Sequence, residues 1–153
     1  MPAKKIKEYL DQNGVKYVTI MHSPAYTAQE VAATAHVSGR EMAKTVIVKV
    51  DGRMAMAVLP ADRKVVLQDL REITGAENVA FATEKEFQEL FPDCELGAMP
   101  PFGNLYGLDV FVAPSLAEDE QIAFNAGTHT EVIQLTYRDF DRLVKPIVTA
   151  FTT

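Results

Sequence analysis

The sequence KTVIVKVDGRMAMAVL, residues Lys44–Leu59, carries the strongest short-range fold signal in the chain. Two stretches of β-branched and other apolar residues flank the dipeptide Asp51-Gly52. Both central residues of a tight hairpin turn commonly need positive φ, which Asp and Gly tolerate better than most residues. The stretch therefore predicts a β-hairpin, with antiparallel strands at 44–50 and 54–59.

Outside this hairpin, apolar spacing and capping residues predict further helices and strands. The expected helices lie at about 3–13, 27–36, 62–74, 83–91 and 137–144. Their starts are marked by side chains that can cap a helix, namely Thr27, Asp62, Thr83 and Thr136. Further strands are expected at 15–21, 108–113, 121–124 and 131–135.

The order of these elements favours an α/β fold of the α+β type. Several strands follow one another through short turns, and the regular strand–helix–strand alternation of a doubly wound parallel sheet is not evident. We expect one domain over residues 1–153, with a mainly antiparallel, curved or barrel-like sheet surrounded by helices. A chain of 153 residues suits a single core of this kind.

Composition narrows the functional classes. No run approaches the roughly 18 apolar residues that a membrane span needs, and the N-terminal lysines precede no apolar segment. The chain has one cysteine, Cys94, so no internal disulfide can form, as is usual in a reducing cytoplasm. The net charge of −6 argues against strong autonomous binding to nucleic acid. We expect a cytoplasmic protein without a membrane partner, and take a monomer as the default.

Several known catalytic motifs are missing. The sequence contains no glycine-rich dinucleotide or phosphate loop and no Gly-x-Ser-x-Gly nucleophile motif. His22, His36 and His129 lack the spacing of metal ligands, so no metal site is expected. No neighbouring base or cation in the sequence activates Cys94, which is therefore interpreted as structural or incidental.

Two further features are candidates. Lys44 opens an apolar strand, where an ammonium could hold a phosphate or polarise a carbonyl, but its spacing alone favours the commoner case of a solvated lysine at a strand start. The run GAMPPFG, Gly97–Gly103, has two prolines that stiffen it and a glycine that permits positive φ. Such a loop could present N–H groups to a developing oxyanion or could be a rigid connector.

Two polar segments are open to the same double interpretation. Asn125–Thr130, NAGTHT, is either a pocket wall in which His129 orients a ligand or an ordinary turn between strands. In His22–Thr27, HSPAYT, a turn followed by a helix cap explains Thr27. His22 and Tyr26 are left as possible ligand contacts.

The ordered set of these segments resembles a known family. HSPAYT at 22–27, AKTVIVK at 43–49, GAMPPFG at 97–103 and FNAGTH at 124–129 follow the order found in the YbaK/prolyl-tRNA-synthetase-associated domain family. Members of this family are trans-editing aminoacyl-tRNA deacylases. The similarity spans about residues 3–145 and implies a barrel-like, mainly antiparallel sheet wrapped by helices.

The resemblance also implies an activity and a site. The activity is hydrolysis of the ester between a mischarged amino acid and the terminal ribose of tRNA, without metal or organic cofactor. Lys44 would anchor the terminal adenosine or the ester, Gly97–Pro101 would hold the aminoacyl group, and Gly127 with His129 would form a third wall. The implied catalytic residues are Lys44, Gly97 and His129. The implied substrate-binding residues are His22, Tyr26, Thr27, Ala98, Met99, Pro100, Pro101, Phe102, Asn125, Gly127 and Thr128.

The implied partner is the acceptor end of an aminoacyl-tRNA, with a synthetase or an elongation factor as a further candidate partner. The expected contacts to tRNA are basic side chains near the site, namely Lys44, Lys49, Arg53, Arg63 and Lys64. Met99 and Phe102 suggest an apolar pocket for alanyl or another small residue. Two alternatives are a non-catalytic binding module of the same fold and a hydrolase of other small esters.

Overall fold

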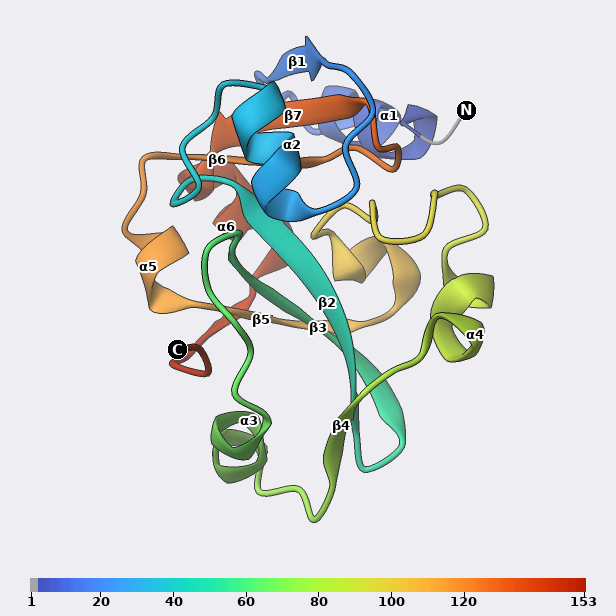
Figure 1. Ribbon diagram of the computed structural model, residues 1–153, viewed down its shortest axis with the longest axis vertical. Helices are drawn as coiled ribbons and strands as arrows, with labels where there is room; N and C mark the ends of the chain where they lie inside the picture. Colours follow the sequence, from blue (N-terminus) through green and yellow to red (C-terminus); the bar gives the residue numbers. More distant parts are fainter. Residues whose placement is uncertain (1–2) are drawn as a thin grey trace.

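The computed structural model describes residues 3–153, and the predicted hairpin is its longest pair of strands (Figure 1). Strands β2 (Ala43–Val50) and β3 (Arg53–Pro60) are antiparallel, with Val50 opposite Arg53. At the turn, φ is 49° for Asp51 and 83° for Gly52. Positive φ at both central residues is the geometry that the Asp-Gly dipeptide predicts.

The strands form two sheets. The larger has the order β4-β2-β3-β5-β8, in which β5 pairs in parallel with β3 and β8 and the other pairs are antiparallel. Its remaining strands are β4 (Val79–Phe81), β5 (Asp109–Val112) and β8 (Ile147–Val148). The smaller sheet is antiparallel throughout and has the order β1-β7-β6. Its strands are β1 (Val18–Met21), β6 (Gln121–Asn125) and β7 (Glu131–Thr136).

The expected mainly antiparallel α/β fold is therefore confirmed, but a closed barrel is not formed. The two sheets meet at one corner, where Met42 bridges to Ala123 and the Ala123 N–H donates to the Glu41 carbonyl at 2.9 Å. This corner lies just before β2, so it brings the start of β2 next to β6.

Helices cover both sheets. The α-helices are α1 (Lys4–Gln12), α2 (Ala28–Thr34), α3 (Leu67–Thr74), α4 (Glu84–Phe87), α5 (Pro114–Ala117) and α6 (Tyr137–Val144). Two 3₁₀ helices, η1 (Gln88–Leu90) and η2 (Gly103–Tyr106), complete the set. The hydroxyls of Thr27, Thr83 and Thr136 each accept a backbone N–H at a helix start, as the capping pattern predicts. No helix within residues 3–153 has the length and apolar character that crossing a bilayer requires.

Three apolar clusters hold the layers together. The main core lies between the two sheets, where Met56 and Val58 of β3 and Phe124 of β6 are fully buried with residues of α1 and α6. A second cluster packs Val31 of α2 against the outer face of the smaller sheet. A third packs Leu70 of α3 against the outer face of the larger sheet. Because side chains alternate between the two faces of each strand, one strand contributes to the main core on its inner face and to a second cluster on its outer face.

One predicted cap is wrong. Asp62 does not start α3, which begins at Leu67 after the N-cap Val66. The C-terminal segment holds residues 64–66 extended: Val65 bridges to Thr152, and the Val66 N–H donates to the Phe151 carbonyl at 2.7 Å. This contact joins segments almost ninety positions apart, so local sequence carried no sign of it. The short elements β4, α5 and β8 were likewise not predicted.

Candidate functional site

A cavity of about 150 Å³ lies where the start of β2, the start of α2, the loop before η2 and the end of β6 converge. It is lined by Ala28, Ala43, Lys44, Thr45, Gly97, Met99 and Asn125. Lys44, Gly97, Met99 and Asn125 were predicted as site residues from three separate segments. The fold thus brings the lysine strand, the glycine–proline loop and the polar turn to one small cavity.

Lys44 is half-buried at the cavity wall. Its Nζ donates to the Ala61 carbonyl at 3.4 Å, a long and therefore weak hydrogen bond. Burial lowers the pKa of Lys44, the nearby Asp62 carboxylate opposes that shift, and Lys64 adds to it. The ammonium makes no ion pair within 4.0 Å among residues 3–153, so most of its donor capacity is available to a ligand.

Gly97 lies in a tight turn over residues 95–98. The Ala98 N–H donates to the Glu95 carbonyl at 3.0 Å, and Gly97 occupies the third position with φ of 84°. Positive φ at this position is the signature of a type II turn and explains why glycine is needed. Within the described residues, no hydrogen bond engages the N–H groups of Gly97 and Met99, and both residues line the cavity.

The polar turn at 125–130 is joined to this glycine turn by backbone and side-chain hydrogen bonds. The Gly127 N–H donates to the Ala98 carbonyl at 2.9 Å, and the Gly127 carbonyl accepts the Glu95 N–H at 2.8 Å. The His129 N–H donates to Glu95 Oε1 at 3.0 Å. The two turns therefore form one structural unit, although the sequence predicts them as two separate walls of the site.

His129 packs against the cavity-lining residue Gly97 and does not itself line the cavity. Its imidazole Nε2 lies 2.8 Å from the Leu96 carbonyl, which can only accept, so Nε2 carries a hydrogen and donates it. The Tyr26 ring contacts the imidazole at 4.8 Å between centroids, with the two ring planes tilted by 48°. Gly97, not His129, lines the cavity, and the imidazole lies against Gly97.

Asn125 lines the cavity and has a polar atom that no protein group engages in the described chain. The residue is 8% exposed, and its Oδ1 is buried without a hydrogen-bond partner in the described chain. A buried amide oxygen without a partner costs free energy, and such groups usually find a partner in a ligand or water. Asn125 therefore adds an unused hydrogen-bonding atom to the set of residues that line the cavity with Lys44.

The other predicted site residues lie around this cavity rather than in its wall. Ala98 and Phe102 are fully buried, and the Phe102 ring packs in the core against Tyr9, Phe124 and Phe140. Pro100 and Pro101 are also buried and make the support of the loop stiff. These residues hold the loop from inside the protein.

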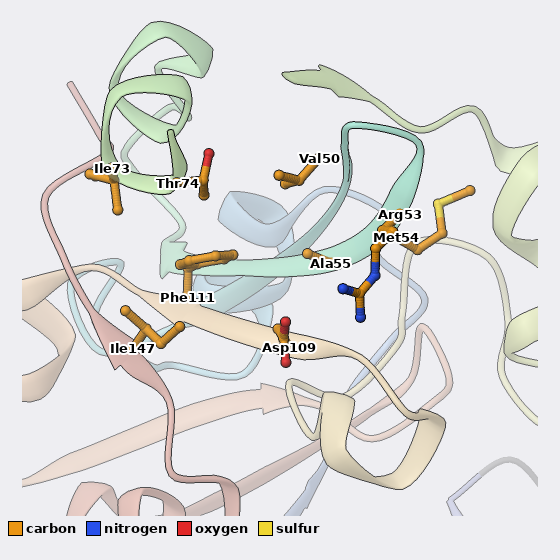
Figure 2. Close-up of a pocket in the computed structure, with 9 residues that line it drawn as sticks. All are labelled: Val50, Arg53, Met54, Ala55, Ile73, Thr74, Asp109, Phe111 and Ile147. Carbon is orange, nitrogen blue, oxygen red and sulfur yellow. The ribbon is translucent and has the colours of Figure 1, made fainter. Parts of the chain in front are cut away.

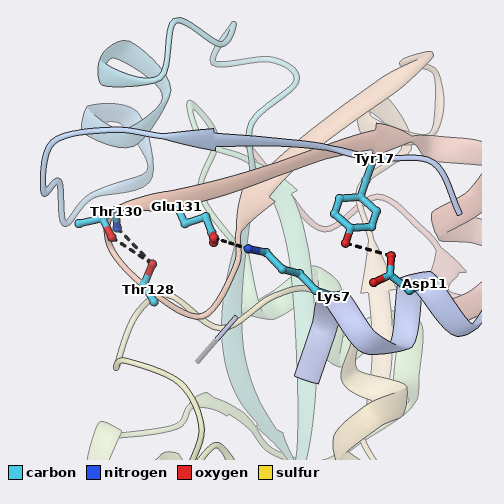
Figure 3. Close-up of polar contacts among 6 residues, drawn as sticks. All are labelled: Lys7, Asp11, Tyr17, Thr128, Thr130 and Glu131. Carbon is cyan, nitrogen blue, oxygen red and sulfur yellow. Dashed lines mark hydrogen bonds and ion pairs between the residues drawn. The ribbon is translucent and has the colours of Figure 1, made fainter. Parts of the chain in front are cut away.

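The remaining predicted residues have local structural roles. Thr27 caps α2 through the Glu30 N–H at 3.1 Å, and His22 Nδ1 lies 2.7 Å from the Ser23 carbonyl. The Thr128 hydroxyl contacts that of Thr130 at 3.3 Å, beside α1 (Figure 3). In the same view, Lys7 of α1 pairs at 2.7 Å with Glu131, the first residue of β7. This pair fixes the turn to α1.

The five predicted tRNA-contacting side chains do not form one patch. Lys44 and Lys49 are five residues apart on β2, about 17 Å at roughly 3.3 Å per residue, and alternation points them to opposite faces. Lys49 pairs with Glu86 of α4. Arg53 borders a separate groove of about 310 Å³ with Asp109 and Phe111, at the far end of the hairpin (Figure 2). Only Arg63 and Lys64 lie on the loop next to Lys44.

Four contributors to the site were missed in the sequence. Ala28, Ala43 and Thr45 line the cavity, and Glu95 joins the two turns. Thr45 follows the predicted lysine directly, so its position was a usable signal. Glu95 lies two residues before Gly97, and no sequence motif marks it as a site residue.

The interpretation of Cys94 as an unreactive residue agrees with its surroundings, because burial raises the pKa of its thiol to about 11.

The sequence of this chain is similar to that of a known family of domains. A sequence model of the aminoacyl-tRNA editing domain matches residues 22–143. The chain belongs to the aminoacyl-tRNA editing domain family. The matched range contains every residue that lines the cavity. The family resemblance predicted from the four ordered motifs is thereby confirmed.

Two curated relatives cover nearly the whole chain. The multifunctional Ser/Thr-tRNA deacylase ProXp-y of Escherichia coli strain K12 is 29% identical over 147 residues, 93% of this chain and 87% of that protein. The prolyl-tRNA editing protein ProX of Acetoanaerobium sticklandii is 25% identical over 142 residues, 89% of this chain and 86% of that protein. The first relative is named as a tRNA deacylase and the second as a tRNA editing protein, and both names agree with the class of enzyme that the motifs predict.

Solved structures of this editing fold superpose over almost the full length. Hypothetical protein APE2540 matches with a TM-score of 0.87 at 24% identity, covering 97% of this chain and 99% of that chain. A candidate trans-editing enzyme for prolyl tRNA synthetase matches with a TM-score of 0.84 at 19% identity, covering 99% and 97%. At these identities the likeness establishes the fold.

Proposed function

We propose that this chain hydrolyses the ester that joins a wrong amino acid to the terminal ribose of a tRNA. The observation that carries the proposal is the convergence of Lys44, Gly97, Met99 and Asn125 on one cavity of about 150 Å³. Family membership and the two deacylase relatives support the reaction class. Free amino acid and uncharged tRNA are the products.

The proposed reaction is attack by water, assisted by the substrate. An aminoacyl ester is already activated, so orientation and stabilisation of the oxyanion supply most of the catalysis. A water oxygen bonds to the carbonyl carbon, the ester C–O bond breaks, and the proton from water passes to the ribose oxygen. The neighbouring ribose hydroxyl positions the water. The unpaired N–H groups of Gly97 and Met99 are the proposed donors to the oxyanion.

Lys44 is proposed to anchor the nucleotide end of the substrate. A half-buried ammonium with one weak hydrogen bond keeps much of its charge unneutralised, and screening by solvent is reduced there. Arg63 and Lys64, on the adjoining loop, would extend the contact to the sugar–phosphate backbone. Because the net charge is −6, we expect this short basic segment to bind only the acceptor end. A synthetase or an elongation factor is proposed to assist the binding of the tRNA.

The amino acid is proposed to be small and to carry a hydroxyl. The cavity admits only a small side chain, and the unpartnered Asn125 amide offers both an acceptor and donors to it. Serine and threonine satisfy this amide, whereas alanine leaves it unpaired. The likeness to a Ser/Thr-tRNA deacylase supports the same choice. This proposal replaces the preference for alanyl that the apolar residues of the loop suggested.

A panel of aminoacyl-tRNAs tests the proposal. We expect release of serine or threonine from mischarged tRNA, and Lys44→Ala should slow it by roughly 10²-fold, as for loss of an electrostatic contact in the transition state. Lys49→Ala, on the same strand but paired with Glu86, is the matched control and should retain the wild-type rate. Binding without release would indicate a non-catalytic module. Near wild-type activity of Lys44→Ala would show that Lys44 does not belong to the catalytic site.

A further inference from the structure

We propose that Glu95 is a positioning residue that holds the glycine turn and the polar turn in register. The inference deepens the proposed deacylase function and rests on it. Nothing in the local sequence around Glu95 distinguishes it from the other exposed glutamates of the chain. Its role is visible only in the contacts between the two turns.

Glu95 is joined to both turns through three different groups. Its carbonyl accepts the Ala98 N–H at 3.0 Å and closes the turn that contains Gly97. Its backbone N–H donates to the Gly127 carbonyl at 2.8 Å. Its side-chain Oε1 accepts the His129 N–H at 3.0 Å. One residue therefore connects the proposed oxyanion donors to the segment that carries Asn125 and His129.

The carboxylate supplies the part of this connection that a substitution can remove. The two backbone bonds persist with any side chain, but the His129 N–H depends on the Glu95 carboxylate for its acceptor. A hydrogen bond from an amide to a charged oxygen is stronger than one between neutral groups. Without it, the polar turn keeps its backbone bonds at Gly127 and the imidazole bond from His129 to the Leu96 carbonyl, but the His129 backbone loses its bond to the glycine turn.

The expected consequence is a loss of alignment rather than a loss of fold. The Glu95 side chain is exposed and belongs to no apolar cluster of the described residues, so its removal should hardly change the core. His129 lies against Gly97, where an added Cβ would be 3.5 Å from the imidazole Cε1. A small shift of His129 would therefore move Gly97 relative to Asn125. Misplacement of this kind lowers the chemical rate more than substrate binding.

Two variants of Glu95 and one control separate these effects. In Glu95→Ala we expect kcat for deacylation to fall about tenfold with KM within about twofold, as for loss of one charge-assisted hydrogen bond at the site. Glu95→Gln retains a side-chain oxygen that can accept the His129 N–H and should recover most of kcat. Glu89→Ala removes an exposed glutamate that makes no side-chain bond to the described residues and should behave as wild type.

Amide hydrogen exchange supplies a readout that does not depend on activity. The His129 N–H should exchange faster in Glu95→Ala than in wild type or Glu95→Gln, while the melting temperatures of all three stay close. An unchanged kcat in Glu95→Ala, or equal damage in Glu95→Gln, would overturn the positioning role. If wild type releases no amino acid from any aminoacyl-tRNA, the proposed function fails instead. Exchange at His129 that is equally slow in Glu95→Ala would then show that the tether itself is absent.

Discussion

Gly97 and His129 lie against each other across the junction of two turns, and a Cβ added to Gly97 would lie 3.5 Å from the His129 Cε1 atom. The two residues come from loops more than thirty positions apart. Their contact aligns the positive-φ turn with the polar turn at 125–130, which begins at Asn125 with its buried amide oxygen. This alignment is what a small substitution at Gly97 would disturb.

Gly97→Ala should therefore lose activity beyond its effect on stability. A φ of 84° is unfavourable for a residue with a Cβ, and we expect destabilisation by about 1 kcal/mol in urea denaturation. The turn should relax away from positive φ and displace the N–H that we propose as an oxyanion donor, so that kcat falls.

Gly75→Ala is the matched control for this prediction. Gly75 ends α3 with φ of 70°, and no heavy atom would lie within 4 Å of an added Cβ. It should show a similar loss of stability with wild-type kcat. Equal activity of the two variants would mean that the Gly97 conformation is not required for catalysis.

Gly103→Ala should damage folding for a different reason. A Cβ at Gly103 would lie 2.7 Å from Val110 Cγ2 and 3.0 Å from the Leu108 carbonyl oxygen, both of which lie in or next to the core. Such overpacking costs about 1–3 kcal/mol. Gly39→Ala, where an added Cβ would meet only the Asp62 Cβ at 4.0 Å, should leave the urea midpoint nearly unchanged. Equal midpoints for the two variants would refute the close packing at Gly103.

The rate of deacylation should fall at alkaline pH as Lys44 loses its proton. Burial disfavours the ammonium and lowers the pKa of Lys44, so its charge is lost at a lower pH than that of an ordinary lysine. The rate, corrected for spontaneous ester hydrolysis at each pH, should decline with a midpoint below the usual lysine pKa. Lys44→Arg keeps its charge throughout this range and should remove the decline. A wild-type rate that stays constant through the ordinary lysine range would contradict a charged anchor.

Asn125→Ala should change which amino acid is released. Removing the amide takes away the partner of a substrate hydroxyl, so we expect seryl-tRNA hydrolysis to slow by about tenfold, a typical net value for one hydrogen bond. Alanyl-tRNA hydrolysis should be little affected or should improve. Parallel single-turnover rates on the two substrates measure the ratio, and an equal change for both would rule out selection by Asn125.

Much of the fold could be predicted because its signals are local. The Asp51-Gly52 turn needs positive φ at adjacent residues, and the hydroxyls of Thr83 and Thr136 cap the helices that directly follow them. The predicted cap at Asp62 failed because the C-terminal Phe151 holds Val66 in an extended conformation. A barrel was expected, but the strands divide into two sheets, which pack on a common core and are bridged at Met42 and Ala123.

The sequence alone determined the residue types of the candidate site and their order: a lysine at a strand start, a stiff glycine–proline loop and a polar turn. The tertiary structure decided which of them share a cavity. It placed Lys44, Gly97, Met99 and Asn125 together, put Phe102 in the core, and carried Lys49 and Arg53 to the other end of the hairpin. The physical reason is that strand pairing and burial act between distant segments, whereas a motif records only its own neighbours. Glu95 illustrates this best, because two of its three contacts are made with Gly127 and His129, which become its neighbours only after folding.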